Sequence, residues 1–230
     1  MKLMHPFWET AFDFDGDAVK AVVVESQELY SEFLSELSIQ IQGESGVFVL
    51  SDNGKTMSIK GNVCLIFNPF VLSQNEKQIL TGVCSELVAE ALGEDKYVRT
   101  NEVISELCSF MNSLALDVDV MLHVEAPSIN DVVKVVVPYY EENYCSLVER
   151  VCSYMDAATK YTKVKLFVFV HLLTYLSDIE YEAFLKHVLY QKYNVMLFES
   201  SSARLRGCED ILIIDRDLCE IRSQTNKSEI

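Results

Sequence analysis

The residues nearest the amino terminus that could carry chemistry are three acids in one short turn. Asp13, Asp15 and Asp17 alternate with other residues around Gly16. Two carboxylates spaced in this way can hold Mg²⁺ while one of them acts as a nucleophile on a phosphoryl group and the other as an acid. That chemistry requires the acids to follow directly on a buried parallel strand. Residues 7–12 are interrupted by polar side chains, which favours a plain acidic turn.

The same turn resembles the Asp-x-Asp-Gly signature of the haloacid-dehalogenase phosphatases. In that family the first Asp, here Asp13, is the nucleophile and the second, here Asp15, is the acid. Asp17 stands where Thr or Val is usual. A Mg²⁺-dependent phosphatase that uses Asp13 and Asp15 is therefore kept as an alternative function.

A second candidate for phosphate chemistry is Gly54-Lys55-Thr56, which has the form of the end of a phosphate-binding loop. The full pattern needs another Gly five residues before Gly54, where the backbone bends around the phosphates, and that position is Val49. Asn53-Gly54 instead supplies the positive φ that a tight hairpin turn needs. We expect a β-hairpin here and no bound nucleotide.

Acids also surround a short extended segment in the middle of the chain, at Asp117, Asp119, Glu125 and Asp131. Hard cations such as Ca²⁺ bind several oxygen ligands, so a cation site and a solvated loop both remain open. The seven cysteines never occur in pairs two to four residues apart, as a structural zinc site would require. Their odd number and wide spacing indicate reduced thiols in a cytoplasmic protein.

Composition and charge limit the classes of partner. The chain is 50% hydrophobic with a formal net charge of −16, which excludes a disordered protein and, taken globally, disfavours nucleic acid. It has no apolar run of about 18 residues and no export leader, so we expect neither a membrane span nor secretion. Nine of the nineteen bases, however, fall in four acid-free windows, at residues 53–75, 157–177, 183–198 and 200–208. A local basic face is sufficient to bind the DNA backbone.

Apolar periodicity predicts the elements that must position these residues. Strands are expected at residues 21–24, 47–50, 56–59, 63–67, 164–170, 195–198 and 211–214. Helices are expected at residues 26–41, 74–92, 100–116, 141–158 and 177–190. The predicted fold class is α/β, a nucleotide-binding-head-like domain without a working phosphate loop, interrupted by an all-helical insertion. The expected divisions are residues 1–69 (first half of the head), 70–158 (helical leg), 159–221 (second half of the head) and 222–230 (disordered tail).

Several of these segments together resemble one family. They are Phe48–Lys55, Asn68-Pro69-Phe70, Lys165–Val170, Tyr175–Asp178, Asn194–Ser200 and, most specifically, Ile213–Ile221. In this order they are similar to the accessory spacer-acquisition protein of type II-A CRISPR systems. The resemblance covers nearly the whole chain, although residues 94–145 match only in pattern.

The resemblance implies a relative of nucleotide-binding heads that is not an enzyme. Members of the family form ring-shaped homotetramers, bind double-stranded DNA ends without sequence preference through lysines that line the ring, and hold Ca²⁺ near the junction of head and leg. They act with the CRISPR integrase and effector nuclease in spacer acquisition. A structural oligomerisation module that binds no DNA is a further alternative.

Site residues follow from the resemblance residue by residue. The calcium carboxylates correspond best to Asp117, Asp119 and Glu125, with His123 where an acid is more usual. The expected DNA-binding residues are Lys134, Lys160 and Lys163, followed by Lys55, Lys60 and Lys77.

Overall fold

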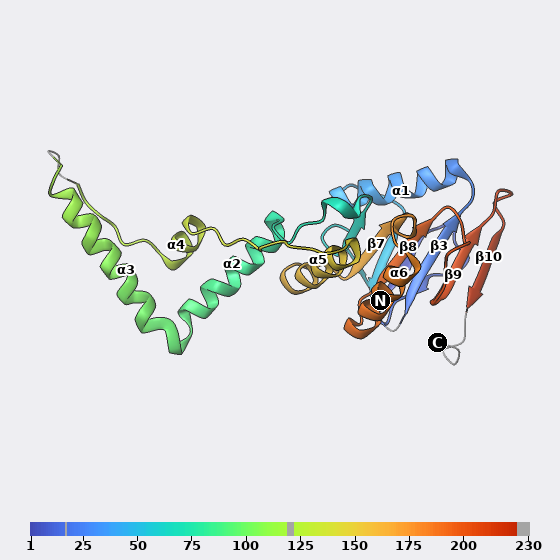
Figure 1. The fold of residues 1–230 in the computed structure, drawn as a ribbon. Helices are drawn as coiled ribbons and strands as arrows, with labels where there is room; N and C mark the ends of the chain where they lie inside the picture. The colour runs from blue at the N-terminus through green and yellow to red at the C-terminus, as the bar shows by residue number, and fades with distance from the viewer. Residues whose placement is uncertain (17, 119–121, 225–230) are drawn as a thin grey trace. The chain divides into compact units, whose positions relative to one another are not determined.

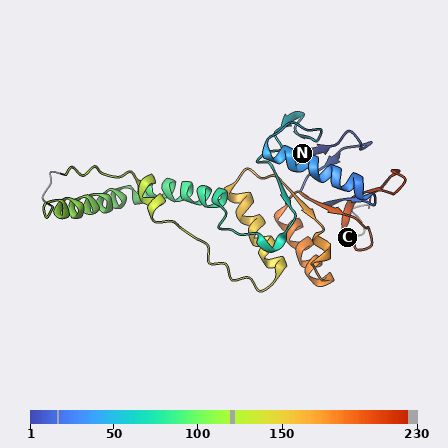
Figure 2. The ribbon, with the colours of Figure 1, turned by 90° about the horizontal axis from the view of Figure 1, so that it is seen from above.

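The structure, a computed structural model, describes residues 1–16, 18–118 and 122–224. Two compact units make up the chain (Figures 1 and 2). Unit 1 comprises Met1–Ser73 and Asn143–Ile230, and unit 2 comprises Gln74–Glu142. Residues 143–158, which the sequence assigned to the helical insertion, lie in unit 1. The mixture of sheets and helices confirms the predicted α/β class.

Unit 1 is built on a six-stranded sheet with the order β10-β9-β3-β8-β7-β6. Five strands run parallel and β10 pairs antiparallel with β9 at one edge, in the ranges β3 (Val19–Val24), β6 (Val63–Ile66), β7 (Leu166–Val170), β8 (Val195–Glu199), β9 (Cys208–Ile214) and β10 (Glu220–Gln224). The strands β3, β7 and β8 are buried along their whole length. Continuous burial of this kind is typical of parallel strands that are covered on both faces.

Three helices pack on this sheet: α1 (Gln27–Gln42), α5 (Leu147–Tyr161) and α6 (Asp178–Gln191). Alternate side chains of a strand enter opposite layers. Phe198 of β8 contacts Phe33 of α1, with ring centroids 6.3 Å apart. Phe169 of β7 points to the other face and meets Phe184 of α6 at 5.6 Å. The helices α1 and α6 therefore cover opposite faces of the sheet (Figure 1).

A second, antiparallel sheet has the order β2-β1-β4-β5, with β1 (Lys2–Met4), β2 (Phe12–Asp13), β4 (Val49–Asp52) and β5 (Lys55–Met57). Asn53 and Gly54 connect β4 to β5 with φ values of 48° and 75°. The predicted hairpin is thus confirmed. The side chains of Leu3, Trp8 and Leu50 join the residues of α1 in the main hydrophobic core.

Unit 2 contains α2 (Lys77–Leu92), α3 (Glu94–Ala115) and α4 (Ile129–Val135). Only Gly93 separates α2 from α3, so α3 begins six residues before the helix expected at residues 100–116. The hydroxyl of Thr100 donates to the carbonyl of Ala91 at 2.8 Å, across the turn between the two helices. No residue of α3 is buried within the described structure.

Each unit ties together the two chain segments that connect it to the other. In unit 1 the guanidinium of Arg150 donates to the Leu72 carbonyl at 3.1 Å and lies 4.8 Å from the ring centre of Tyr144. In unit 2 the side-chain amide of Asn75 donates to the Tyr140 carbonyl at 3.0 Å, and its oxygen accepts from the Tyr140 amide at 2.6 Å. The outgoing and returning segments are therefore held side by side within each unit.

The end of the chain corrects one expectation. Residues 222–224, assigned to a disordered tail, continue β10, while residues 225–230 lie outside the described structure. Arg222 forms a two-pronged ion pair with Asp210 of β9, with distances of 2.6 and 2.8 Å. This charge-assisted contact anchors a strand that its polar sequence did not indicate. None of the described helices is long and apolar enough to cross a membrane.

Candidate nucleic-acid interface

The connection between β3 and α1 occupies the place where a nucleotide-binding head carries its phosphate loop. That loop is an eight-residue pattern between a strand and a helix. Here β3 ends at Val24 and α1 begins at Gln27, so only Glu25 and Ser26 lie between them. The hydroxyl oxygen of Ser26 accepts from the Leu29 amide and caps α1. The head therefore has no room for a phosphate loop at this position, and Gly54-Lys55-Thr56 lies in the hairpin instead.

The acidic turn lacks the strand geometry of the phosphatase alternative. Asp13 ends β2, a two-residue strand that pairs antiparallel with β1. Its exposed carboxylate forms an ion pair with Lys2 at 3.3 Å. The required parallel strand before the motif is absent from the described part of the chain, because β3, the nearest parallel strand, follows the turn.

Doubly wound folds usually bind ligands at the carboxyl edge of the sheet, and at the end of β8 this edge is occupied by packed side chains. The Glu199 carboxylate, at the end of β8, accepts from the Leu173 amide at 3.2 Å and lies 3.5 Å from Nδ1 of His171. Tyr30 of α1 stacks on His171 with ring centroids 5.1 Å apart. Burial raises the pKa of Glu199 above its ordinary value, although Leu173, His171 and Arg204 act in the opposite direction.

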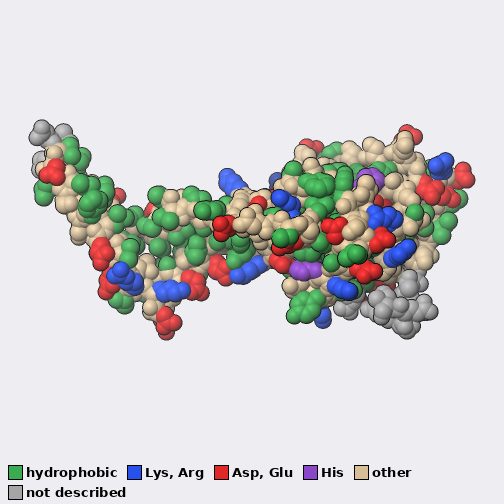
Figure 3. Space-filling view, viewed as in Figure 1, with side chains coloured by type: hydrophobic (Ala, Val, Ile, Leu, Met, Phe, Trp, Pro, Cys, Tyr) green, Lys and Arg blue, Asp and Glu red, His purple; other side chains and the backbone are tan. Residues whose placement is uncertain are grey.

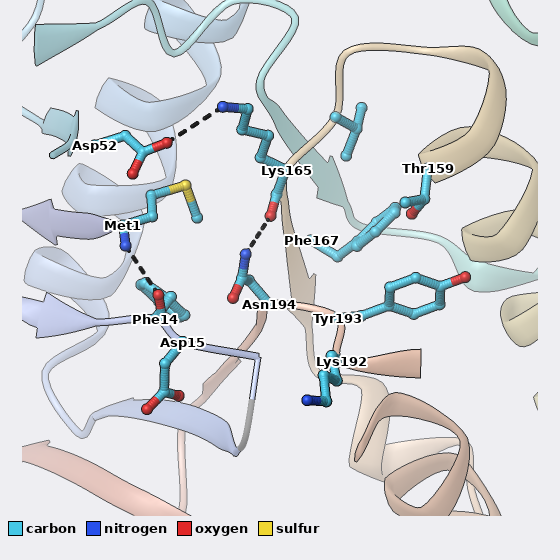
Figure 4. Close-up of a pocket in the computed structure, with 11 residues that line it drawn as sticks. Met1, Phe14, Asp15, Asp52, Thr159, Lys165, Phe167, Lys192, Tyr193 and Asn194 are labelled. Atoms are coloured by element: carbon cyan, nitrogen blue, oxygen red, sulfur yellow. Dashed lines mark hydrogen bonds and ion pairs between the residues drawn. The ribbon is translucent and has the colours of Figure 1, made fainter. Parts of the chain in front are cut away.

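A pocket of about 380 Å³ lies instead at the amino ends of β7 and β8 (Figure 4). Its lining combines cationic, polar and aromatic side chains from the acidic turn, the β4–β5 hairpin, the end of α5 and the α6–β8 connection. They are Met1, Phe14, Asp15, Asp52, Thr159, Val164, Lys165, Phe167, Lys192, Tyr193 and Asn194. We call this region the amino-edge pocket.

The backbone of Lys165 is fixed at the start of β7. Its amide donates to the Asn62 carbonyl at 2.8 Å, and its carbonyl accepts from the Asn194 side chain at 2.9 Å. The ammonium group reaches across to the hairpin and pairs with Asp52 at 3.3 Å (Figure 4). In this state the charge of Lys165 is offset by a carboxylate of the same pocket.

Lys192 enters the pocket from the opposite side. It ends α6 in the left-handed conformation, with φ 57°. Gly16, with φ 79°, packs so closely on it that a Cβ at position 16 would lie 2.5 Å from the Lys192 carbonyl oxygen. The glycine of the acidic turn is thus needed for close approach of two backbone segments.

Tyr193, the next residue, is buttressed from the side of α5 and α6. Its hydroxyl donates to Oδ1 of Asp156 at 2.7 Å, and His187 contacts the same oxygen at 2.8 Å. Burial, and then the hydrogen bond to Asp156, raise the pKa of Tyr193 above its ordinary value. The phenol therefore remains protonated at neutral pH and holds the aromatic wall of the pocket in place.

The lysines predicted from the sequence are distributed over both units. Lys55 begins β5 directly opposite Asp52, while Lys160 and Lys163 lie at and just beyond the end of α5. Lys160 donates to the hydroxyl of Tyr161 at 2.8 Å, and Lys163 is exposed. Lys55, Lys160 and Lys163 thus belong to segments that border the amino-edge pocket.

The other three predicted lysines lie elsewhere. The ammonium of Lys60 donates to the Gln42 carbonyl at 2.9 Å, so it caps the carboxyl end of α1. Lys77 begins α2 and Lys134 belongs to α4, where it pairs with Asp131 at 3.4 Å. Lys77 and Lys134 are therefore residues of unit 2.

Sequence reasoning did not select Lys165 and Lys192 as site residues. Both fall in acid-free windows, at residues 157–177 and 183–198, and this absence of acids was the available signal. The fold brings the two windows together because the segments before β7 and β8 are neighbours in the sheet. Among described residues, Lys163 and Lys192 form no ion pair.

The residues expected to bind calcium are only partly described. Asp117 and Glu125 are exposed, and Asp119 lies outside the described residues. Across residues 1–16, 18–118 and 122–224, no group of three or more His, Cys, Asp or Glu side chains is arranged to hold a metal ion. The calcium site therefore stays a prediction.

The protein is an α/β head with a doubly wound parallel sheet and a helical insertion. It has no room for a phosphate loop after β3. A family model described as CRISPR-associated protein (Cas_Csn2) matches residues 40–218. The chain belongs to this CRISPR-associated family, which confirms the resemblance found in the sequence. No curated protein matches the chain.

One solved structure shares the fold. The crystal structure of Stu0660 of Streptococcus thermophilus has a TM-score of 0.63 at 14% identity, covering 98% of this chain and 76% of that one. CbiO1 from Clostridium perfringens, part of an ABC transporter complex, has a TM-score of 0.48 at 11% identity, covering 89% and 76%. The ATP-binding cassette MJ0796 has a TM-score of 0.46 at 10% identity, covering 94% and 89%. The last two likenesses are too distant to define a fold.

Proposed function

We propose that this CRISPR-associated protein binds double-stranded DNA, at its ends and without sequence preference, during spacer acquisition in the cytoplasm, and that it does so without catalysis. The observation that carries the proposal is that Lys165 and Lys192 line one pocket of a chain whose net charge is −16. Lys55 lies opposite the lining residue Asp52, and Lys163 precedes the lining residue Val164. Neutralising DNA phosphates with clustered lysines releases counterions and needs no base-specific contact.

Self-association into a homotetramer is part of the proposal. Residues 107–116, at the carboxyl end of α3, carry no charge, and Phe110 is 59% exposed there. Apolar side chains gather toward this end of α3, whereas charged ones lie toward its amino end (Figure 3). An exposed apolar face of this kind favours an interface between protein chains. In a fourfold ring each DNA-contacting lysine would be present four times.

The DNA proposal is tested by measuring binding to duplexes of one sequence in linear and covalently closed circular form over a series of salt concentrations. We expect tight binding to linear DNA that weakens steeply with salt, and weak binding to closed circles. Equal affinity for the two forms contradicts threading on ends. No binding to either form leaves the structural oligomerisation module as the function.

Oligomeric state and calcium are tested together by size-exclusion chromatography with light scattering, with added Ca²⁺ and with chelator. A tetrameric mass supports the ring, and a monomer under both conditions refutes it. Whether Ca²⁺ binding depends on Asp117, Asp119 and Glu125 is tested by isothermal titration with Ca²⁺ on a variant of each residue.

We expect the partners in the cell to be the CRISPR integrase and the effector nuclease. Pull-down experiments with purified components test this expectation.

A further inference from the structure

The ion pair between Lys165 and Asp52 lies inside the proposed DNA-binding surface. Both side chains are partly exposed, at 47% for Lys165 and 33% for Asp52, and both line the amino-edge pocket. Asp52 also lies directly opposite Lys55 in the β4–β5 hairpin. Asp52 is therefore ion-paired with one lysine of the proposed surface and is the strand neighbour of another.

The backbone of Lys165 is already ordered without the ion pair. Its amide and carbonyl are bonded to Asn62 and Asn194 at 2.8 and 2.9 Å. The hairpin that carries Asp52 is likewise held by its own ladder to β5 and by the pairing of β4 with β1. The contact between Lys165 and Asp52 is thus not needed to form either segment.

We propose that Asp52 is an affinity-limiting residue, a built-in competitor that occupies Lys165 until a DNA phosphate displaces it. This inference rests on the proposed DNA-binding function and names a residue that limits the affinity for DNA. Exposed ion pairs contribute little to stability, so a polyanion can replace the carboxylate at small cost. While Asp52 is in place, part of the attraction of Lys165 for phosphate is lost, and the protein releases DNA more readily.

The test compares Asp52→Asn and Asp52→Ser with the unchanged protein on linear duplex DNA across a salt series. Removing the carboxylate frees Lys165 for a phosphate, so we expect tighter binding and a salt slope steeper by up to about 0.9 for each additional phosphate that is neutralised. Asp52→Glu, which keeps the charge, is expected to bind like the unchanged protein. The second uncharged variant, Asp52→Ser, replaces Asp52→Asn as the readout if the latter does not fold.

Two controls distinguish the effect of breaking the ion pair between Asp52 and Lys165 from the effect of removing one negative charge anywhere on the protein. Asp178→Asn removes a carboxylate that pairs with Arg204 at 2.9 Å, at the start of α6 and away from the amino-edge pocket. It is expected to leave DNA binding unchanged. In a Lys165→Ala background, Asp52→Asn is expected to lose most of its effect, because the two residues act as a pair.

Several outcomes overturn the inference. Unchanged affinity in both Asp52→Asn and Asp52→Ser overturns it, and so does an equal increase in affinity from Asp178→Asn or in the Lys165→Ala background. In each of these cases the lysine variants still weaken binding, and the proposed function stands. If the unchanged protein binds no DNA at any salt concentration, the proposed function fails and the inference fails with it.

Discussion

Gly16 and Lys192 lie in backbone contact, so close that a Cβ on Gly16 would be 2.5 Å from the Lys192 carbonyl oxygen. This contact joins the acidic turn to the connection between α6 and β8, and it fixes one side of the amino-edge pocket. The glycine that suggested a phosphatase signature is therefore explained by packing.

We expect Gly16→Ala to be strongly destabilising. A left-handed residue with a Cβ costs about 1–2 kcal/mol, and the overlap with Lys192 adds about 1–3 kcal/mol. Gly54→Ala is the matched control, because Gly54 has a similar φ of 75° but nothing within 4 Å of the added Cβ. Chemical denaturation of both variants measures the difference. Equal destabilisation would show that the close approach to Lys192 is unimportant.

Removing lysines that line or border the amino-edge pocket is expected to weaken DNA binding to the same extent for every DNA sequence. Each lysine removed from a phosphate lowers the salt slope by about 1, so the Lys163→Ala, Lys192→Ala double variant should lower it by about 2. Arg216→Ala removes an exposed cation from the β9–β10 loop, at the opposite edge of the sheet, and should have no effect. An equally large reduction of the salt slope in Arg216→Ala would show that DNA binds away from the amino-edge pocket.

Replacing Glu199 with Gln is expected to stabilise the protein increasingly as the pH rises. Because burial raises its pKa in the folded state, the contribution of Glu199 is fully present below the ordinary pKa and is lost as pH rises through the folded value. The Gln variant carries no charge at any pH and avoids this loss. In thermal unfolding, the melting temperature of the variant should exceed that of the unchanged protein by an amount that grows from about pH 4 to about pH 8. Each kcal/mol of added stability raises the melting temperature by roughly 2–4 °C.

Glu182→Gln serves as the control for that experiment, because Glu182 is an exposed residue of α6. It should change the melting temperature little at any pH. An advantage of Glu199→Gln that is the same at both ends of the pH range would contradict a burial effect on the ionised form.

A charge in the apolar half of α3 is expected to reduce self-association. Phe110→Asp places a carboxylate among Leu107, Met111 and Leu114, all exposed on the protomer. Asn112→Asp adds the same charge two positions along the helix, on a different face. Light scattering should give a lower mass for Phe110→Asp alone. An unchanged mass would exclude this face of α3 from the interface.

Elements with strong local signals were predicted well from the sequence. The apolar run at residues 21–24 is β3, the helix expected at residues 26–41 is α1, and Asn53-Gly54 forms the hairpin turn. Each of these signals depends on a few neighbouring residues. The structure therefore confirms them with small shifts of boundary.

Elements that depend on distant partners were missed. The strand β1 is only three residues long and exists because it pairs with β2 and β4. The polar strand β10 is held by the contact of Arg222 with Asp210. The pocket was missed for the same reason, since Lys165 and Lys192 are 27 positions apart and meet only through the pairing of β7 with β8.

The contacts of Arg150 bear on how much the length of the inserted unit 2 can change. By holding the Leu72 carbonyl and the Tyr144 ring at once, it closes unit 1 at the point where the chain leaves and returns. The closure entropy of whatever is inserted there rises only slowly with its length. We therefore expect the large sheet still to assemble when unit 2 is shortened or replaced by a brief linker.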